Sequence, residues 1–185
     1  LDAFHSRDVE RLERAMELVV DLDCNILRCW GGNVYENNRF YELCDENGIC
    51  VWQDFSMACY IYPQDEDFQK VIADEARKVI KRLRQHPSLV LWSGDNECDS
   101  AYEYTGVGNP NLNVLTRGIL KAAVRDEDHL RPYLPSSPFT DHKAFEDGVC
   151  GVDSGERFVT ENHLWGPRDS FKSDYYRNAA CHLVS

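Results

Sequence analysis

The stretch that decides the fold is Leu89–Glu97, LVLWSGDNE, in which an apolar run ends at a glycine and is followed by polar residues that include two carboxylates. The apolar run predicts a strand covered on both faces, as parallel strands in α/β proteins are. A carboxylate at the carboxyl end of such a strand lies where α/β barrels and open α/β sheets hold their chemistry. The stretch therefore predicts an α/β fold with Glu97 at its functional edge.

Helical and strand patterns alternate on both sides of this stretch. Apolar spacing predicts helices over residues 6–23, 38–47, 65–85 and 112–124, and further strands over residues 25–30, 49–55, 131–136, 158–165 and 181–185. Gly48 follows the second helix at the position of a left-handed cap. This alternation implies βαβ units and a parallel sheet. With six predicted strands, no internal repeat and no linker, we expect a single domain over residues 1–185.

Composition excludes several classes of protein. The 185 residues, 43% of them hydrophobic, suffice for one domain with a real core. The net charge of -12 argues against a nucleic-acid partner, because binding a phosphate backbone requires clustered Lys and Arg. No apolar stretch approaches the roughly 20 residues of a membrane span, so we expect no membrane partner either. The sequence does not determine the cellular compartment of the protein.

Metal and redox motifs are missing from the sequence. The eight cysteines stand mostly inside apolar segments at irregular spacings, which favours small buried thiols and leaves a disulfide possible in principle. There is no CxxC pair, and the six histidines show neither HxH nor HExxH spacing. A zinc site or a metal-dependent hydrolase therefore has little support, and we expect no metal and no cofactor.

Polar and aromatic side chains recur where the predicted strands end. They are Arg28 and Trp30 at the first strand, Trp52 and Asp54 at the second, Asn96 and Glu97 at the third, and His163 and Trp165 at the fifth. Each has a structural alternative: an indole can close the core, Arg28 can neutralise a carboxylate, Asp54 can cap a loop, and Glu97 can be a solvated loop residue. Their recurrence on one rim of one sheet favours a shared site.

The residue types of this rim suit a carbohydrate, because indoles cover the apolar C–H faces of a pyranose while polar groups bind its hydroxyls. Cleavage of a glycosidic bond needs a proton donor on the leaving oxygen and a second carboxylate at the anomeric carbon. Glu97 can be the donor. Asp95 is adjacent in a strand-end turn, and we expect it to point elsewhere. The partner carboxylate should therefore come from another strand end.

Several motifs occur in a characteristic order along nearly the whole chain. They are RCWGG at 28–32, YE at 35–36, FYELCDENGI at 40–49, WQDF at 52–55, WSGDNE at 92–97, RPY at 131–133 and PSSP at 135–138. Together they resemble the catalytic barrel of glycoside hydrolase family 2, in its β-mannosidase-like branch. The resemblance implies a (β/α)₈ TIM barrel, present here as about strands 2–7, and a retaining, exo-acting β-glycosidase.

The resemblance also implies roles for the rim residues. Glu97 would be the general acid/base, and Asn96 would hold the substrate 2-hydroxyl. The terminal-sugar subsite would be lined by the remaining strand-end residues, Arg28, Trp30, Trp52, Asp54, His163 and Trp165. The implied substrate is a β-linked carbohydrate, with mannose first and galactose, glucuronic acid or glucosamine as alternatives. Members of this branch more often carry Asn at the position of Asp95, a departure that bears on sugar specificity and leaves the acid/base unaffected.

The nucleophile is the largest departure from the family pattern. Residues 182–185, HLVS, resemble the approach to the nucleophilic Glu of the family, which by this alignment would follow Ser185 directly. We therefore expect this chain to be the core of a longer barrel and to be inactive alone; only Glu161, near another strand end, could substitute. The alternative from another class is a carbohydrate-binding or scaffold domain with a degenerate site. Glu after Ser185 would favour the enzyme, and a non-acidic residue the binding domain.

Overall fold

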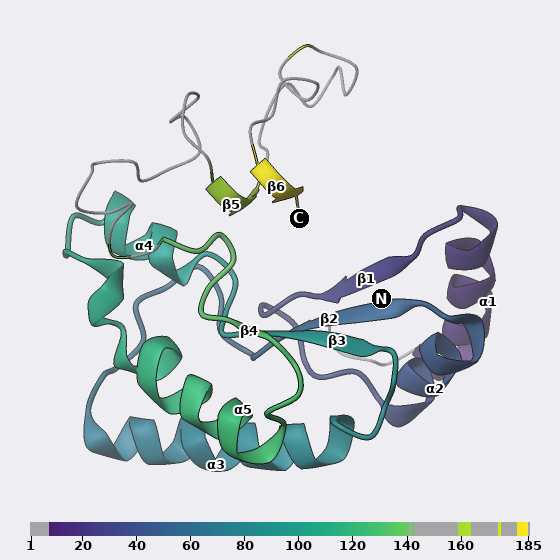
Figure 1. The fold of residues 1–185 in the computed structure, drawn as a ribbon, viewed down its shortest axis with the longest axis horizontal. Helices are drawn as coiled ribbons and strands as arrows, with labels where there is room; N and C mark the ends of the chain where they lie inside the picture. The colour runs from purple at the N-terminus through teal and green to yellow at the C-terminus, as the bar shows by residue number, and fades with distance from the viewer. Residues whose placement is uncertain (1–7, 141, 143–158, 164–173, 175–180, 185) are drawn as a thin grey trace.

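A computed structural model of the chain describes residues 8–140, 142, 159–163, 174 and 181–184 (Figure 1). Its elements in chain order are α1 (Asp8–Asp21), β1 (Ile26–Cys29), α2 (Asn38–Asn47), β2 (Cys50–Asp54), α3 (Glu66–Leu83), β3 (Leu89–Ser93), α4 (Cys98–Tyr104), η1 (Pro110–Leu112), η2 (Leu115–Leu120), α5 (Lys121–Glu127), β4 (Tyr133–Leu134), β5 (Val159–Asn162) and β6 (Cys181–Val184).

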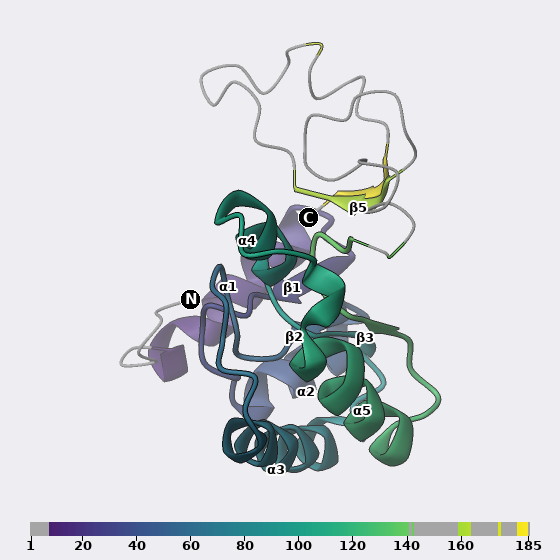
Figure 2. The ribbon, with the colours of Figure 1, turned by 90° about the vertical axis from the view of Figure 1, so that its left-hand side faces the viewer.

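The first four strands form one parallel sheet in the order β1-β2-β3-β4, so each strand pairs with the next along the chain. Figure 1 shows α3 and α5 side by side against this sheet, with α4 near the ends of the strands. β5 and β6 form a second parallel pair, and Figure 2 shows them beyond α4, at the end opposite α3. The predicted α/β class with a parallel sheet is confirmed.

The core lies between the sheet and its helices. β2 is buried along nearly its whole length, as expected of an inner strand of a parallel sheet. Trp92 is fully buried, stacks on Phe55 at a centroid distance of 5.2 Å, and donates its indole N–H to Asp128 at 2.9 Å. Because this buried N–H has a partner, the largest side chain of β3 fills the core without an unpaired donor.

Local capping explains where the long helices begin and end. Asn37 accepts a hydrogen bond from the backbone N–H of Phe40 at 3.0 Å, and Asp65 caps α3 in the same way. α2 ends at Gly48, which has a φ of 67° and donates its N–H to the carbonyl of Cys44. The predicted left-handed cap at Gly48 is confirmed.

The segment after β3 differs from the prediction. A helix over residues 112–124 was expected; instead the chain forms the 3₁₀ turn η1, the π-helix η2 and then α5, which extends to Glu127. Pro110 begins η1, and Gly118 lies inside η2, where its low helix propensity weakens a regular α-helix. α4 was not predicted, because its seven residues are too few for a clear apolar period.

The fourth strand is shorter than predicted, with Tyr133–Leu134 in place of residues 131–136. Pro132 and Pro135 flank it, and neither can donate a ladder hydrogen bond. β5 and β6 fall within their expected ranges of 158–165 and 181–185. The sequence pattern therefore located these strands well and overestimated only the lengths of β4 and β5.

Six thiols of the described residues are free, those of Cys24, Cys29, Cys44, Cys50, Cys59 and Cys98. Cys44 and Cys98 are buried, as predicted, whereas Cys59 is exposed. Cys150 lies outside the described residues. In the part of the chain that the structure describes, no helix combines the length and apolarity that a membrane crossing needs.

Candidate active site

The turn after β3 carries the candidate acid/base. Glu97 has a φ of 58°, in the left-handed region that residues other than glycine rarely adopt. The turn is held from both sides, because Asn96 N–H donates to the Met57 carbonyl at 3.0 Å and Glu97 N–H donates to the Ser137 carbonyl at 2.8 Å. Such strain costs about 1–3 kcal/mol and is concentrated at functional sites. The surrounding backbone therefore imposes the direction of the Glu97 side chain.

The Glu97 carboxylate is partly buried and lies between two elements. Its Oε1 is 2.6 Å from Nδ1 of His163, the residue that follows β5. Its Oε2 is 3.6 Å from the thiol Sγ of Cys59, in the loop after β2. About a quarter of the side chain, 26%, stays exposed. The carboxylate is thus oriented by neighbours and still reachable by a ligand.

The hydrogen bonds of His163 determine its tautomer. Its Nε2 lies 3.1 Å from Nη1 of Arg28 and 2.9 Å from Oγ of Ser137. A guanidinium can only donate, so Nε2 accepts from Arg28 and the ring hydrogen sits on Nδ1. Nδ1–H therefore donates to Oε1 of Glu97. The imidazole transmits the orientation of Arg28 to the candidate acid/base.

Arg28 is anchored by Asp54 at the end of β2. Nη2 donates to Oδ2 at 2.7 Å, Nε donates to Oδ1 at 3.3 Å, and Gly31 N–H also donates to Oδ2 at 3.0 Å. Burial raises the pKa of Asp54, while the Arg28 charge and these hydrogen bonds act to lower it. Nη2 of Arg28 also donates to Oδ1 of Asn96 at 3.0 Å. Both structural alternatives, charge neutralisation by Arg28 and loop capping by Asp54, are therefore real, and they serve the same cluster.

Close backbone packing explains the glycine that follows Trp30. A Cβ on Gly31 would collide with the carbonyl oxygens of Met57 and Phe55, which are backbone atoms and cannot yield. Only glycine lets the loop after β1 approach the loop after β2 closely enough for the Gly31–Asp54 hydrogen bond.

The indoles at the rim differ in accessibility. Trp30 is 50% exposed and can offer a ring face to a ligand. Trp52 is only 3% exposed, and its ring lies under Arg28, whose Cζ is 5.0 Å from the ring centroid. The ring of Trp52 is thus covered by the guanidinium and supports Arg28 through a cation–π contact.

The structure does not describe the side chains of two further residues of the sequence prediction. Trp165 lies outside the described residues. Glu161 belongs to β5, where its backbone pairs with Leu183 of β6. Of the eight predicted site residues, the structure thus joins Arg28, Asp54, Asn96, Glu97 and His163 in one hydrogen-bonded cluster, with Trp30 and Trp52 beside it.

A second cluster behind the acid/base turn was missed by the sequence prediction. Asp95 is fully buried, and its Oδ1 accepts hydrogen bonds from Ser136 Oγ at 2.5 Å and from Cys98 N–H at 3.1 Å. Its Oδ2 has no hydrogen-bond partner among the described residues. Neighbouring Asp99 accepts two hydrogen bonds from Arg117, both at 2.5 Å. Asp95 therefore points away from the rim, as expected.

The two carboxyl groups of this second cluster carry different charges. Burial, reinforced by the negative charge of Asp99, raises the pKa of Asp95 to about 8. Burial also raises the pKa of Asp99, but the direct bonds from Arg117 and from Thr140 N–H oppose this. Asp95 thus holds its proton at neutral pH while Asp99 is ionised. No sequence signal pointed to this pair, because α4, which carries Asp99, was not predicted.

No His, Cys, Asp or Glu side chains gather into a potential metal site within the described part of the chain.

An apolar cavity of about 310 Å³ lies along the outer edge of β1 and is lined mainly by α1 and β1. It reaches Arg28 and Trp30 but is otherwise lined mostly by apolar side chains, among them Leu12, Met16 and Leu27. The polar chemistry therefore concentrates at the strand ends.

Comparison with known proteins identifies the family. The model of the family 2 glycosyl hydrolases, TIM barrel domain, matches residues 5–117, which include Arg28, Asp54, Asn96 and Glu97. The chain belongs to glycosyl hydrolase family 2. The resemblance inferred from the motifs is confirmed, and the parallel sheet is part of a family 2 barrel.

Several curated relatives of this chain are named β-mannosidases. The chain is 38% identical over 157 residues to a β-mannosidase of Bos taurus, and 46% identical over 164 residues to β-mannosidase B of Thermothelomyces thermophilus. These alignments cover 80% and 81% of this chain but 18% of each relative. The chain therefore spans about a fifth of the length of these curated relatives.

Solved structures agree with this assignment. The crystal structure of a β-D-mannosidase from Dictyoglomus thermophilum superposes with a TM-score of 0.69 at 40% identity, covering 82% of this chain and 18% of that one. A β-glucuronidase from Bacteroides uniformis has a TM-score of 0.60 at 18% identity, covering 76% of this chain and 17% of that one, and shows the shared fold alone.

Proposed function

We propose that this family 2 domain supplies the acid/base side of the active site of a retaining, exo-acting β-glycosidase that hydrolyses terminal β-linked mannosides. The observation that carries the proposal is the Glu97 carboxylate, which lies at the end of β3, is oriented by His163, and adjoins the Asn96–Arg28–Asp54 cluster. The β-mannosidases among its relatives support mannose as the terminal sugar.

Glu97 would act first as an acid and then as a base. In the first step it protonates the leaving oxygen as the glycosidic bond breaks and a carboxylate nucleophile bonds to the anomeric carbon. In the second it takes a proton from the water that hydrolyses the glycosyl-enzyme. Because His163 Nδ1–H already donates to Oε1, the proton to be transferred belongs on Oε2, on the side of Cys59.

Asn96 and Arg28 would position the sugar. The amide oxygen Oδ1 of Asn96 already accepts a hydrogen bond from Arg28. The amide Nδ2 faces the Cys59 sulfur at 3.3 Å, a weak acceptor that a sugar 2-hydroxyl could replace. The carboxylate nucleophile is proposed to come from another strand end of the barrel.

The decisive test uses the full natural protein, as wild type and as Glu97→Gln, on β-glycosides with good and poor leaving groups. We expect the wild type to cleave the β-mannoside selectively. Glu97→Gln should lose about 10²–10⁴-fold on poor leaving groups and much less on activated aryl mannosides, which need little protonation to depart.

An exposed glutamate of α3 offers the control, since Glu66→Gln should leave all rates unchanged. Selective cleavage of another β-linked sugar would retain the mechanism and replace mannose as the substrate. Binding of sugars without any cleavage by the wild type would instead favour a carbohydrate-binding domain with a degenerate site.

A further inference from the structure

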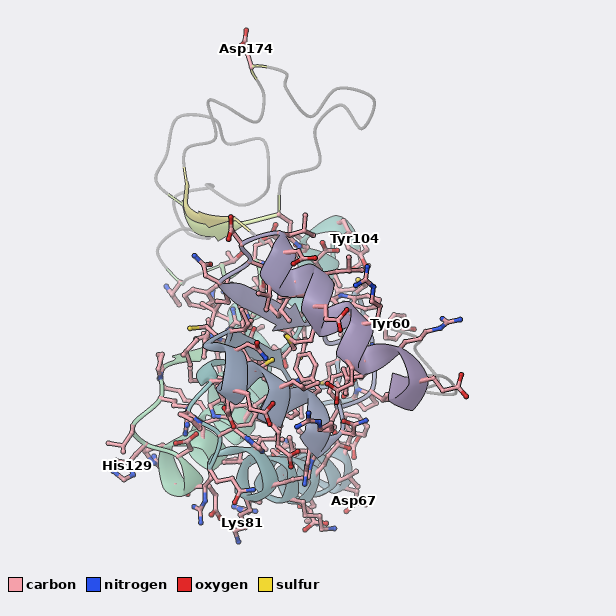
Figure 3. The ribbon with its side chains drawn as sticks, turned by 90° about the vertical axis from the view of Figure 1, so that its right-hand side faces the viewer. Tyr60, Asp67, Lys81, Tyr104, His129 and Asp174 are labelled. Carbon is pink, nitrogen blue, oxygen red and sulfur yellow. The ribbon has the colours of Figure 1, made fainter. Side chains whose placement is uncertain are left out.

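Two tyrosines near the acid/base turn expose most of their surface. Tyr60 is 70% exposed and Tyr104, the last residue of α4, is 67% exposed. Figure 3 labels both on one side of the molecule, away from His129 and Lys81. They are not independent, because the hydroxyl of Tyr104 donates to the carbonyl of Cys59, the residue before Tyr60, at 2.9 Å.

The loop that carries Tyr60 is fastened to the acid/base turn. Cys59 N–H donates to the Asn96 carbonyl at 2.7 Å, and Cys59 has a φ of 53°, in the left-handed region. Its Sγ lies 3.6 Å from Oε2 of Glu97. Tyr60 and Tyr104 therefore flank the residue that touches Oε2.

Tyr60 is also supported from behind. Its ring makes an edge contact with Tyr62 at a centroid distance of 6.2 Å, and Tyr62 stacks on Phe68 of α3 at 6.3 Å. The Tyr62 hydroxyl accepts the N–H of Ala58 at 3.0 Å, which ties this aromatic row to the same loop. A supported ring loses little conformational freedom when a ligand covers it.

The Glu97 oxygen that carries the transferred proton determines on which side the leaving group lies. Oε1 of Glu97 is taken by His163, so a leaving oxygen that receives its proton from Oε2 approaches on the Cys59 side. The sugar attached to that oxygen then extends past Cys59. The exposed rings at this place are those of Tyr60 and Tyr104, whose apolar faces and hydroxyls suit a pyranose.

Exposed apolar side chains are common and need no function when they stand alone, as Leu130 does at 84% exposure. Tyr60 and Tyr104 differ from Leu130 because Tyr60 belongs to the loop that contacts the acid/base, and Tyr104 is hydrogen-bonded to that loop through the Cys59 carbonyl. This connection to the acid/base loop is what Leu130 lacks, and it favours a functional role for the two exposed tyrosines.

We propose that Tyr60 and Tyr104, on either side of Cys59, form the subsite for the leaving-group sugar of a β-linked oligosaccharide. They act as specificity-determining residues that favour a sugar over a small leaving group. The proposal rests on the proposed function of Glu97 and extends it to the other side of the scissile bond.

The test compares two substrates of the full natural protein, β-1,4-mannobiose and β-mannosyl fluoride, whose leaving fluoride cannot occupy the subsite. Tyr60→Ala combined with Tyr104→Ala should lower kcat/KM on mannobiose about 10-fold, since each aromatic contact contributes a few-fold, and should leave the fluoride unchanged. Tyr104→Phe, which keeps the ring but loses the bond to the Cys59 carbonyl, should show a smaller loss on mannobiose alone. Leu130→Ala is the control and should match the wild type on both.

Two results would overturn the subsite: wild-type kcat/KM on mannobiose in the double variant, or an equal loss on both substrates. A wild-type protein that cleaves neither substrate would refute the proposed function itself. The two failures are thus distinguishable, because the first requires an active wild type and the second an inactive one.

Discussion

Two Arg–Asp pairs in this domain are equally buried but differ in what surrounds them. In both Arg28–Asp54 and Arg117–Asp99 the aspartate side chain is 0% exposed and the arginine side chain 17%. The remaining donors of Arg28 reach Asn96 and His163 at the rim. Those of Arg117 reach structural groups behind α4, namely Thr116, Asn111 and the Thr140 carbonyl. Burial of an ion pair therefore says little about its role, and the destination of its other hydrogen bonds says much more.

The largest loss of stability is expected when the buried Arg117–Asp99 pair is broken. Asp99→Ala leaves the Arg117 charge buried without its carboxylate, which should destabilise the protein by about 3–5 kcal/mol. Urea unfolding followed by circular dichroism measures this. Asp67→Ala, at an exposed aspartate of α3 whose carboxylate contacts Lys70, is the control and should change stability by less than about 0.5 kcal/mol. Equal losses of stability in the two variants would show that the buried pair contributes no more than the exposed one.

Weakening the Arg28–Asp54 pair at the rim should reduce mainly the catalytic activity. Asp54→Asn keeps an acceptor for Arg28 but loses the charge that holds the guanidinium against Asn96 and His163. A charge-assisted hydrogen bond contributes about 1.5–3 kcal/mol, so kcat/KM on a β-mannoside should fall roughly 10–100-fold. The stability loss should be smaller than in Asp99→Ala, because Arg28 can be hydrated from the open site. Steady-state kinetics on the full natural protein and unfolding of the same variant test this, and the reverse ranking would contradict the comparison.

Asp95, next to the Arg117–Asp99 pair, should make stability depend on pH. Its folded pKa, about 8, is above the ordinary value of 3.8, so the native state binds more protons than the unfolded state between these values. Stability should therefore fall as pH rises from about 4 to 8, by on the order of 1 kcal/mol per pH unit at most.

The matched variant is Asp95→Asn, which replaces a neutral carboxyl group by a neutral amide of similar shape. It should remove this pH dependence and equal or exceed the wild type in stability at pH 7. Thermal unfolding between pH 5 and pH 8, buffered at constant ionic strength, compares the two. A wild-type midpoint that stays parallel to that of Asp95→Asn over this range would show that Asp95 does not titrate as inferred.

The smallest effect is expected where a pair is exposed to solvent. Lys78 contacts Asp74 one helical turn away on α3 at 2.6 Å, and both side chains are mostly exposed. Lys78→Ala should change the free energy of unfolding by no more than about 0.5 kcal/mol. A larger change, measured by the same urea titration, would mean that burial is not what separates the strong pairs from the weak one.

Local pattern was sufficient for much of the fold. The apolar period of residues 65–85 and the cap at Gly48 predicted α3 and the end of α2, because both signals depend on neighbouring residues. The same kind of signal was too short for α4, and it overestimated β4, where Pro132 and Pro135 limit strand pairing. At the site, Trp52 was misjudged because only packing reveals that Arg28 covers it.

The sequence by itself determined that parallel strands would end in Arg28, Asp54, Asn96 and Glu97, because side-chain type and strand period are local properties. Only the tertiary structure decided how these side chains are used. Arg28 and His163 are 135 residues apart, and their contact sets the tautomer that orients Glu97. The proton on Asp95 likewise depends on burial and on the charge of Asp99, two properties that arise only when distant elements pack together.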